Sequence, residues 1–196
     1  MNKELKIEFK LLIGEDHIAI DDLLNDPERL LECYMSEENP TDSSFQGGYC
    51  ISINEKKWNG KEDFYFDQFS YTLNWLTGLE KLLSKKITAT DVGFWEESRA
   101  TATLKGYNEL EIVDTWSLDK IIAYPCIVDF EEFCKLILIE SRKYEQLASL
   151  VKNRIASKKS KDPSDLKKEK QIIEAMCGDE FAHYCNKLEL LIKEYF

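Results

Sequence analysis

The sequence holds only two histidines, His17 and His183, and histidine is the side chain that most readily exchanges protons near neutral pH. Nucleophilic catalysis needs such a base beside a serine or cysteine, and neither histidine lies in a known signature such as G-x-S-x-G. The pair Gly47-Gly48 precedes an expected strand, so it cannot place a helix N-terminus against a phosphate. We therefore predict no catalytic residue and no bound cofactor.

A metal site needs several thiolate, imidazole or carboxylate ligands close together, and Cys177, His183 and Cys185 come nearest to that pattern. Zinc sites use cysteine pairs roughly two to four residues apart and further ligands, a spacing that this segment lacks. On one continuous helix the two cysteines would lie about 80° apart and about 12 Å along the axis. We predict core thiols beside a surface histidine, and no metal.

Adjacent carboxylates recur along the chain, in the pairs Asp21-Asp22, Glu37-Glu38, Glu96-Glu97 and Glu131-Glu132. Neighbouring side chains point to opposite faces of a strand, and they diverge by about 100° around a helix. Such pairs form no general acid–base couple without partners from elsewhere, so they favour a solvated acidic surface. A metal-dependent nuclease built from scattered carboxylates is the alternative interpretation.

The net charge is −11 and is unevenly distributed. Residues 1–132 carry 27 acidic and 13 basic side chains, whereas residues 133–196 carry 10 acidic and 13 basic side chains. The basic cluster consists of Lys158, Lys159, Lys161, Lys167, Lys168 and Lys170. It contains no arginine and no interleaved aromatic residue, and the net charge repels polyanions, so we do not expect nucleic acid as a partner.

Hydrophobic periodicity predicts strands first and helices last. Expected strands cover residues 5–13, 17–20, 49–53, 87–95, 99–105 and 109–116, the last three forming an antiparallel meander over residues 87–116. Expected helices begin at Asp26-Pro27, run from about 66 to 83, begin at Asp129, and extend from about 164 to the end. This order favours an α+β fold with an antiparallel sheet packed with helices.

The last two expected helices are separated only by a short lysine-rich break, so we expect them to form a C-terminal helical hairpin. We divide the chain into an acidic α+β segment, residues 1–128, and the helical hairpin, residues 129–196. The hairpin is expected to pack on the first segment, so that both form one structural unit.

The six cysteines are scattered among apolar neighbours, and a domain of this length buries enough surface to be stable without disulfides. Residues 1–14 mix charged with apolar side chains and so lack the apolar core of a signal peptide. No apolar run approaches the roughly 18 residues of a membrane span. We expect a cytoplasmic protein with free thiols and no membrane contact.

Without a catalytic signature, the acidic charge is the strongest functional indication, because complementary charge accelerates association and selects partners. In general character, although without a shared motif, the chain resembles bacterial immunity proteins and phage anti-defence proteins. This favours a non-enzymatic inhibitor that binds a basic toxin or a nucleic-acid-handling enzyme. We expect the partner-binding residues to be Glu96, Glu97, Glu109, Glu111 and Trp58.

Two other classes of function stay open. One is an enzyme whose pocket gathers tyrosines, His17 and acidic residues in a way that the sequence hides. The other is an oligomeric module, in which the near-heptad apolar stripe of residues 130–155 pairs with a second copy to form a homodimer. For Trp58, the alternative to an interface anchor is a cap over the end of the core.

Overall fold

The computed structural model describes residues 4–36, 46–58, 66–94, 98–116, 120–158, 162–176 and 180–196. The strands are β1 (Leu5–Ile13), β2 (Asp16–Ala19), β3 (Gln46–Ile53), β4 (Lys56–Lys57), β5 (Phe66–Asp67), β6 (Ala89–Phe94), β7 (Ser98–Leu104), β8 (Glu109–Trp116) and β9 (Lys120–Asp129). The helices are α1 (Ile20–Asn25), α2 (Pro27–Ser36), α3 (Gln68–Leu83), α4 (Phe130–Lys158), α5 (Pro163–Met176) and α6 (Glu180–Tyr195).

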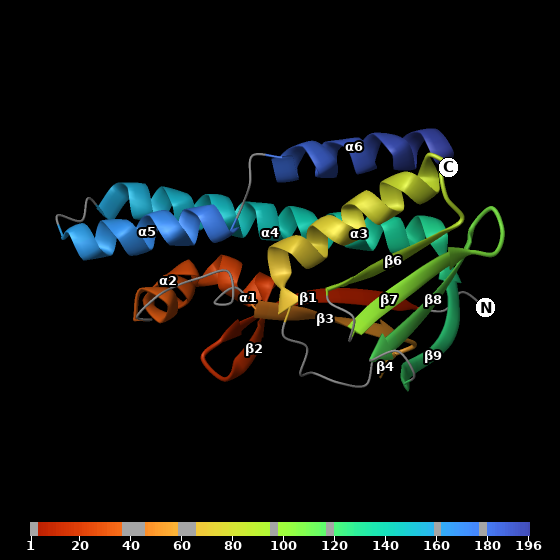
Figure 1. Cartoon of the computed structure of the whole chain (residues 1–196), viewed down its shortest axis with the longest axis horizontal. Helices are drawn as coiled ribbons and strands as arrows, with labels where there is room; N and C mark the ends of the chain where they lie inside the picture. Colours follow the sequence, from red (N-terminus) through yellow and green to blue (C-terminus); the bar gives the residue numbers. More distant parts are fainter. Residues whose placement is uncertain are drawn as a thin grey trace.

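The strands form two antiparallel sheets (Figure 1). In sheet A the order is β2-β1-β3-β4, and β5 also pairs with β3. In sheet B the order is β6-β7-β8-β9, so each strand pairs with its neighbour in sequence. The expected α+β fold with an antiparallel sheet is confirmed, and the expected meander is the first part of sheet B.

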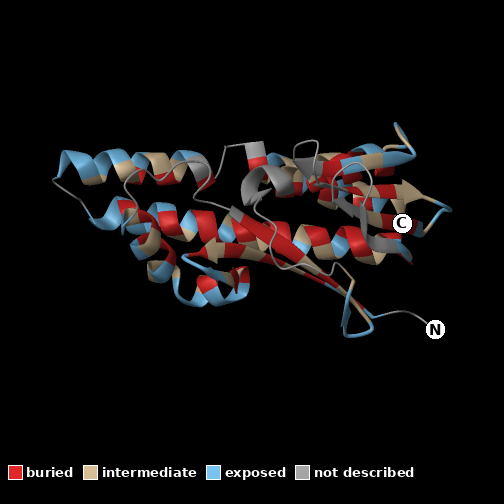
Figure 2. Ribbon diagram, turned by 60° about the horizontal axis from the view of Figure 1, so that its bottom comes forward, coloured by how far each residue is buried: buried red, intermediate tan, exposed pale blue. Residues whose placement is uncertain are grey.

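The long helix α4 organises the core. Figure 1 shows α3, α4 and α6 on one side of the two sheets, with α5 folded back along the end of α4. The near-heptad stripe of α4 is buried throughout, and it consists of Phe130, Phe133, Ile137, Tyr144, Leu147, Val151 and Ile155. Buried residues gather where helices and strands face each other, and exposed residues follow the outer side of α5 (Figure 2). Residues from both segments of the chain share this core.

Glu140 joins the middle of α4 to sheet A. The backbone N–H of Phe9 donates a hydrogen bond of 2.9 Å to Glu140 Oε2, and the Lys143 Nζ lies 2.7 Å from Glu140 Oε1. The Phe9 N–H lacks a strand partner because β2 ends at Ala19, opposite Lys10. The buried carboxylate therefore completes the hydrogen bonding of β1 at the point where β2 leaves the sheet.

Gly78 lets α3 approach sheet B closely. A Cβ atom at this position would lie 2.8 Å from Thr90 Oγ1 and 3.0 Å from Thr90 Cγ2 on β6. The glycine inside the expected helix is thus explained by a close helix–strand contact. The glycine lowers the helix propensity of α3, and in return α3 packs closely against β6.

Three elements differ from the expectation. The short helix α1 follows β2 directly, and β9 adds a fourth strand that contains Pro125. A proline is compatible with β9 because this strand lies at the edge of sheet B, where one side of its backbone needs no partner. The expected last helix is present as α5 and α6, and α4 with α5 forms the hairpin.

Candidate interaction surface

The candidate surface is the outer face of sheet B, the face that points away from the core. Side chains alternate between the two faces of a strand, and opposite residues of an antiparallel pair share a face. The inner face is buried and carries Ala100, Ala102, Leu110, Ile112 and Val128. The residues between them in sequence therefore form the outer face.

Two cross-strand rows make up this outer face, and their side chains are half-buried or exposed. The first row consists of Asp91, Thr101 and Val113. The second row crosses all four strands and consists of Ala89, Thr103, Glu111 and Ile127. Thr101 Oγ1 donates a hydrogen bond of 2.7 Å to Asp91 Oδ1, while Ile127 is 45% exposed. We call these two rows, together with Glu109, the sheet B face.

Glu109 and Glu111 lie two residues apart on β8 and so share the sheet B face. The Lys105 Nζ lies 2.8 Å from Glu111 Oε1 and partly neutralises that carboxylate. Glu109 is exposed and lies opposite Asp129 of β9. Within the described ranges Glu109 forms no ion pair, so its charge is available on the surface.

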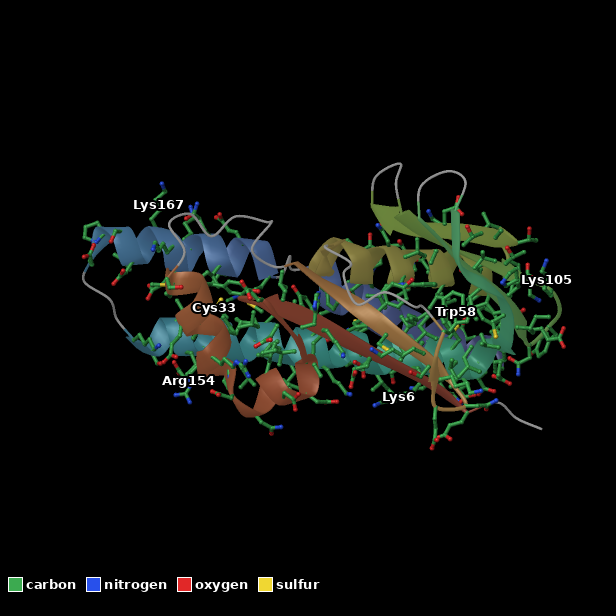
Figure 3. The ribbon with its side chains drawn as sticks, turned by 90° about the horizontal axis from the view of Figure 1, so that it is seen from below. Lys6, Cys33, Trp58, Lys105, Arg154 and Lys167 are labelled. Carbon is green, nitrogen blue, oxygen red and sulfur yellow. The ribbon has the colours of Figure 1, made fainter. Side chains whose placement is uncertain are left out.

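The other expected partner-binding residues are Glu96, Glu97 and Trp58. Glu96 and Glu97 lie outside the described residues. Trp58 is half-buried, packs against the core, and closes the β3–β4 hairpin because its N–H donates a hydrogen bond of 2.8 Å to the Ile51 carbonyl. Figure 3 shows Trp58 beside the place where sheets A and B approach each other. This position is consistent with a cap over the end of the core.

The turn before β8 is fixed to the N-terminus of α4. Asn108 Oδ1 accepts a hydrogen bond of 2.9 Å from the Glu131 N–H, and Asn108 Nδ2 donates one of 2.7 Å to Asp129 Oδ2. Asp129 Oδ1 accepts the Glu132 N–H at 2.8 Å, as expected of the residue that caps this helix. Burial raises the pKa of the Glu132 carboxyl, and the nearby Asp129 and Glu4 carboxylates raise it further. These acids stabilise the helix terminus, which explains their position without a partner.

Aromatic side chains hold the same turn from the other side. The Tyr107 ring stacks on Tyr195 with a centroid distance of 5.2 Å and an interplanar angle of 12°. Phe130 meets Phe196 edge to face at 5.6 Å. The end of α6 therefore fixes the turn that leads into Glu109, which makes this edge of the sheet B face a preformed surface.

Acidic residues of the first segment pair with basic residues of the C-terminal helices. Lys143 Nζ lies 2.6 Å from Asp21 Oδ2, while Glu28 binds both Arg154, at 3.3 Å, and Lys158, at 2.8 Å. The hydrogen bond from Lys158 and the positive charges of Lys158 and Arg154 lower the pKa of Glu28, against a smaller effect of burial. Part of the uneven charge distribution in the sequence is therefore compensated by ion pairs within the molecule.

Several lysines of the basic cluster, among those that the structure describes, make separate contacts. Lys158 binds Glu28, Lys168 Nζ donates a hydrogen bond of 2.9 Å to the Met35 carbonyl, and Lys159 and Lys161 lie outside the described residues. Lysines that bridge α4 or α5 to α2 do not form a continuous track for phosphates. Figure 3 shows Lys167 and Arg154 on different helices, far from Lys105.

Sheet A carries a basic face that sequence reasoning missed. Lys6, Glu8 and Lys10 alternate on the outer side of β1, where Glu8 lies 3.6 Å from Lys6 and 3.5 Å from Lys10. Lys57 of β4 lies opposite Ser52, which in turn lies opposite Lys6. The pairing of β1, β3 and β4 brings these lysines onto one face of sheet A. In the sequence, only the alternation of charged and apolar residues along β1 could have indicated part of this face.

The residues that came nearest to a metal-binding pattern in the sequence are Cys177, His183 and Cys185. On α6 the Cys185 side chain is fully buried while His183 is exposed, and Cys177 lies outside the described residues. No group of three or more histidine, cysteine or acidic side chains is arranged to hold a metal in the described part of the chain. The cysteines within it, Cys33, Cys50, Cys126, Cys134 and Cys185, are all free thiols.

A homodimer through residues 130–155, the alternative that the sequence leaves open, would use the apolar stripe of α4. That stripe is occupied by the molecule's own core, and Phe133, Ile137 and Leu147 are fully buried. A second copy could not reach these side chains without displacing sheet A, α3 or α6. The near-heptad spacing reflects packing within one chain.

Comparisons identify no relative of this chain. No protein-family model matches it, and neither the curated proteins nor the solved structures contain a significant match. Among the described helices, none combines the length and the hydrophobicity that crossing a bilayer requires.

Proposed function

We propose that this chain is a non-enzymatic, acidic protein-interaction protein that binds a basic partner through the sheet B face. The observation that supports the proposal is an open sheet face with half-buried threonines beside an exposed isoleucine, bordered by carboxylates. Protein interfaces commonly combine a less polar centre with a polar rim. A basic toxin or a nucleic-acid-handling enzyme, inhibited in the manner of an immunity or anti-defence protein, fits this chemistry.

The sheet B face supports the proposal better than the acidic residues of the first segment do. Asp21 and Glu28 are bound by basic residues of α4, so their charge is largely compensated. Glu109, in contrast, is exposed and free of described cations. Exposed carboxylates at the rim steer a basic partner toward the face and thereby raise its association rate.

A charge-reversal experiment tests the proposal. The intact protein is used for affinity capture at low salt from a lysate of its source cell, and the captured protein is purified for binding kinetics. In the double variant Glu109→Lys, Glu111→Lys we expect the association rate constant to fall by about 10-fold or more at low salt. The matched control, Glu15→Lys with Asp26→Lys, makes the same charge change at exposed positions remote from sheet B.

The control separates a local interface from an effect of net charge. Equal loss of binding in both double variants would mean that only the overall charge matters. Capture of no basic protein, or unchanged kinetics in the sheet B variant, would show that the proposal is wrong. Circular dichroism and thermal unfolding establish beforehand that both variants fold like the natural sequence.

A further inference from the structure

The turn between β7 and β8 carries an exposed aromatic ring beside an exposed carboxylate. Tyr107 lies in the turn and is 62% exposed, and Glu109 begins β8. The Glu109 Oε2 atom lies 3.4 Å from the position that a Cβ atom on Gly106 would take. The carboxylate therefore lies over the turn, next to the residue that carries the ring. Figure 3 shows Lys105, which precedes Gly106, at the end of sheet B.

The Tyr107 ring has one covered face. Tyr195 stacks on that face with a centroid distance of 5.2 Å and an interplanar angle of 12°. Phe196 lies 6.0 Å from the Tyr107 centroid but only 4.7 Å from that of Tyr195, so it stands on the Tyr195 side of the stacked pair. Because these rings lie on one side and most of the residue is exposed, the opposite face of Tyr107 is open to solvent.

The ring and its turn are held in place from two sides. The Tyr107 hydroxyl donates a hydrogen bond to the Tyr195 carbonyl, and Asn108 Nδ2 donates one of 2.7 Å to Asp129 Oδ2. A group that is ordered before binding loses little conformational freedom when a ligand arrives, which favours affinity. The same aromatic cluster already accepts a cation, because the Lys85 Nζ lies 5.4 Å from the Tyr195 ring centroid.

An open aromatic face beside a carboxylate matches the chemistry of arginine. The planar guanidinium group stacks on aromatic rings, and its N–H donors bind carboxylates in a forked geometry that the lysine ammonium group lacks. Tyrosine is also among the residues that most often anchor protein interfaces. Glu109 has no ion pair within the described part of the chain, so its carboxylate can accept such donors.

From these features we infer that the turn between β7 and β8 binds an arginine side chain of the partner. The guanidinium group stacks on the open face of Tyr107 and donates hydrogen bonds to the Glu109 carboxylate. The inference rests on the proposed function, extends the sheet B face to Tyr107, and names the side chain by which a basic partner engages it.

Two labelled peptides of equal length and charge test this inference by fluorescence anisotropy with the intact protein. In one peptide arginine alternates with glycine, and in the other lysine does. We expect the natural sequence to bind the arginine peptide about 5-fold more tightly than the lysine peptide. Tyr107→Leu, which replaces the ring by an apolar side chain, should remove this preference, whereas Tyr107→Phe keeps the ring and should preserve it. Glu109→Gln should weaken binding of the arginine peptide more than Glu15→Gln, a matched charge change at an exposed position remote from sheet B.

Equal binding of the two peptides by the natural sequence overturns the inference, and this result does not depend on whether a variant folds. A preference for arginine that survives in Tyr107→Leu overturns it as well, and so does equal weakening by Glu109→Gln and Glu15→Gln.

The proposed function is decided by a different measurement, the association kinetics of the captured partner with the double variant Glu109→Lys, Glu111→Lys. Slowed association together with no arginine preference overturns the inference and leaves the acidic docking face standing. An arginine preference that depends on Tyr107, together with unchanged association, supports the arginine site and overturns the proposed function.

Discussion

Replacement of Glu140 by alanine tests how α4 is joined to sheet A. The Glu140 side chain is only 5% exposed, and its two oxygens bind the Phe9 N–H at 2.9 Å and Lys143 at 2.7 Å. In the alanine variant the Phe9 N–H stays buried without its acceptor, because β2 has already ended. A buried polar group left without a partner costs about 1–3 kcal/mol, and loss of a charge-assisted hydrogen bond lies at the upper end of that range.

The remaining contribution comes from Lys143. This lysine is 27% exposed and keeps Asp21 at 2.6 Å, so solvent and its second partner compensate most of the lost ion pair. We therefore expect Glu140→Ala to lower the free energy of unfolding by about 3 kcal/mol. For a chain of this length that corresponds to a fall of roughly 6–12 °C in the midpoint of thermal unfolding.

The measurement is urea unfolding followed by circular dichroism, together with a thermal scan. The matched control is Glu145→Ala on the same helix, which removes a carboxylate 2.8 Å from Arg142 that is 27% exposed and should cost less than about 1 kcal/mol. Glu140→Gln keeps an oxygen for the Phe9 N–H and should fall between the two alanine variants. Equal stability of Glu140→Ala and Glu145→Ala would refute the role assigned to the buried carboxylate.

Two further predictions concern packing and pH. Gly78→Ala gains about 1 kcal/mol of helix propensity, but the new Cβ would lie 2.8 Å from Thr90 Oγ1, so the substitution should destabilise the protein with the natural Thr90. In a Thr90→Ala background the clash is absent, and the same substitution should stabilise the protein. A change of the same sign in the free energy of unfolding in both backgrounds, measured by urea unfolding, would contradict the close contact. Glu28 has a folded-state pKa below its unfolded value of 4.5, so its contribution to stability is present above that pH and is lost as the pH falls through the lowered pKa. Glu28→Gln should accordingly reduce stability at pH 7 and flatten its acid dependence between about pH 5 and 3; an unchanged dependence would rule out the pairing with Arg154 and Lys158.

Local sequence patterns predicted the elements that rest on local physics. The alternation along residues 99–105 and 109–116 predicted β7 and β8, because one buried and one solvated face impose a period of two. Asp129 was recognised as the start of α4, because a capping carboxylate satisfies donors within the same turn. Such signals depend only on neighbours along the chain.

Elements that depend on distant contacts were missed. Strand β9 was not predicted, because Pro125 usually ends a strand and is compatible with one only at an edge. The helix α1 spans six residues, too few for a stable helix in isolation, and it is held by packing against α4. Whether a strand is central or peripheral is a property of the whole sheet.

The candidate site likewise contains residues that the sequence indicated and residues that only the sheet pairing brings together. Glu109 and Glu111 were selected from the sequence as acidic side chains of a strand, and β8 places both on one face. Ile127 and Asp91 carried no signal, because their neighbours on the sheet B face come from other strands. The basic face of sheet A was equally hidden, since Lys57 joins Lys6 only through the pairing of β3 with β4.

The sequence by itself determined the fold class, the net negative charge and the lack of a catalytic signature, because composition and periodicity express these properties directly. Only the tertiary structure decided which charges remain available to a partner. Asp21 and Glu28 lie more than a hundred residues from the basic side chains that bind them, whereas Glu109 is left exposed. Coulomb interactions act over ångströms in space, and distance along the chain does not reveal them.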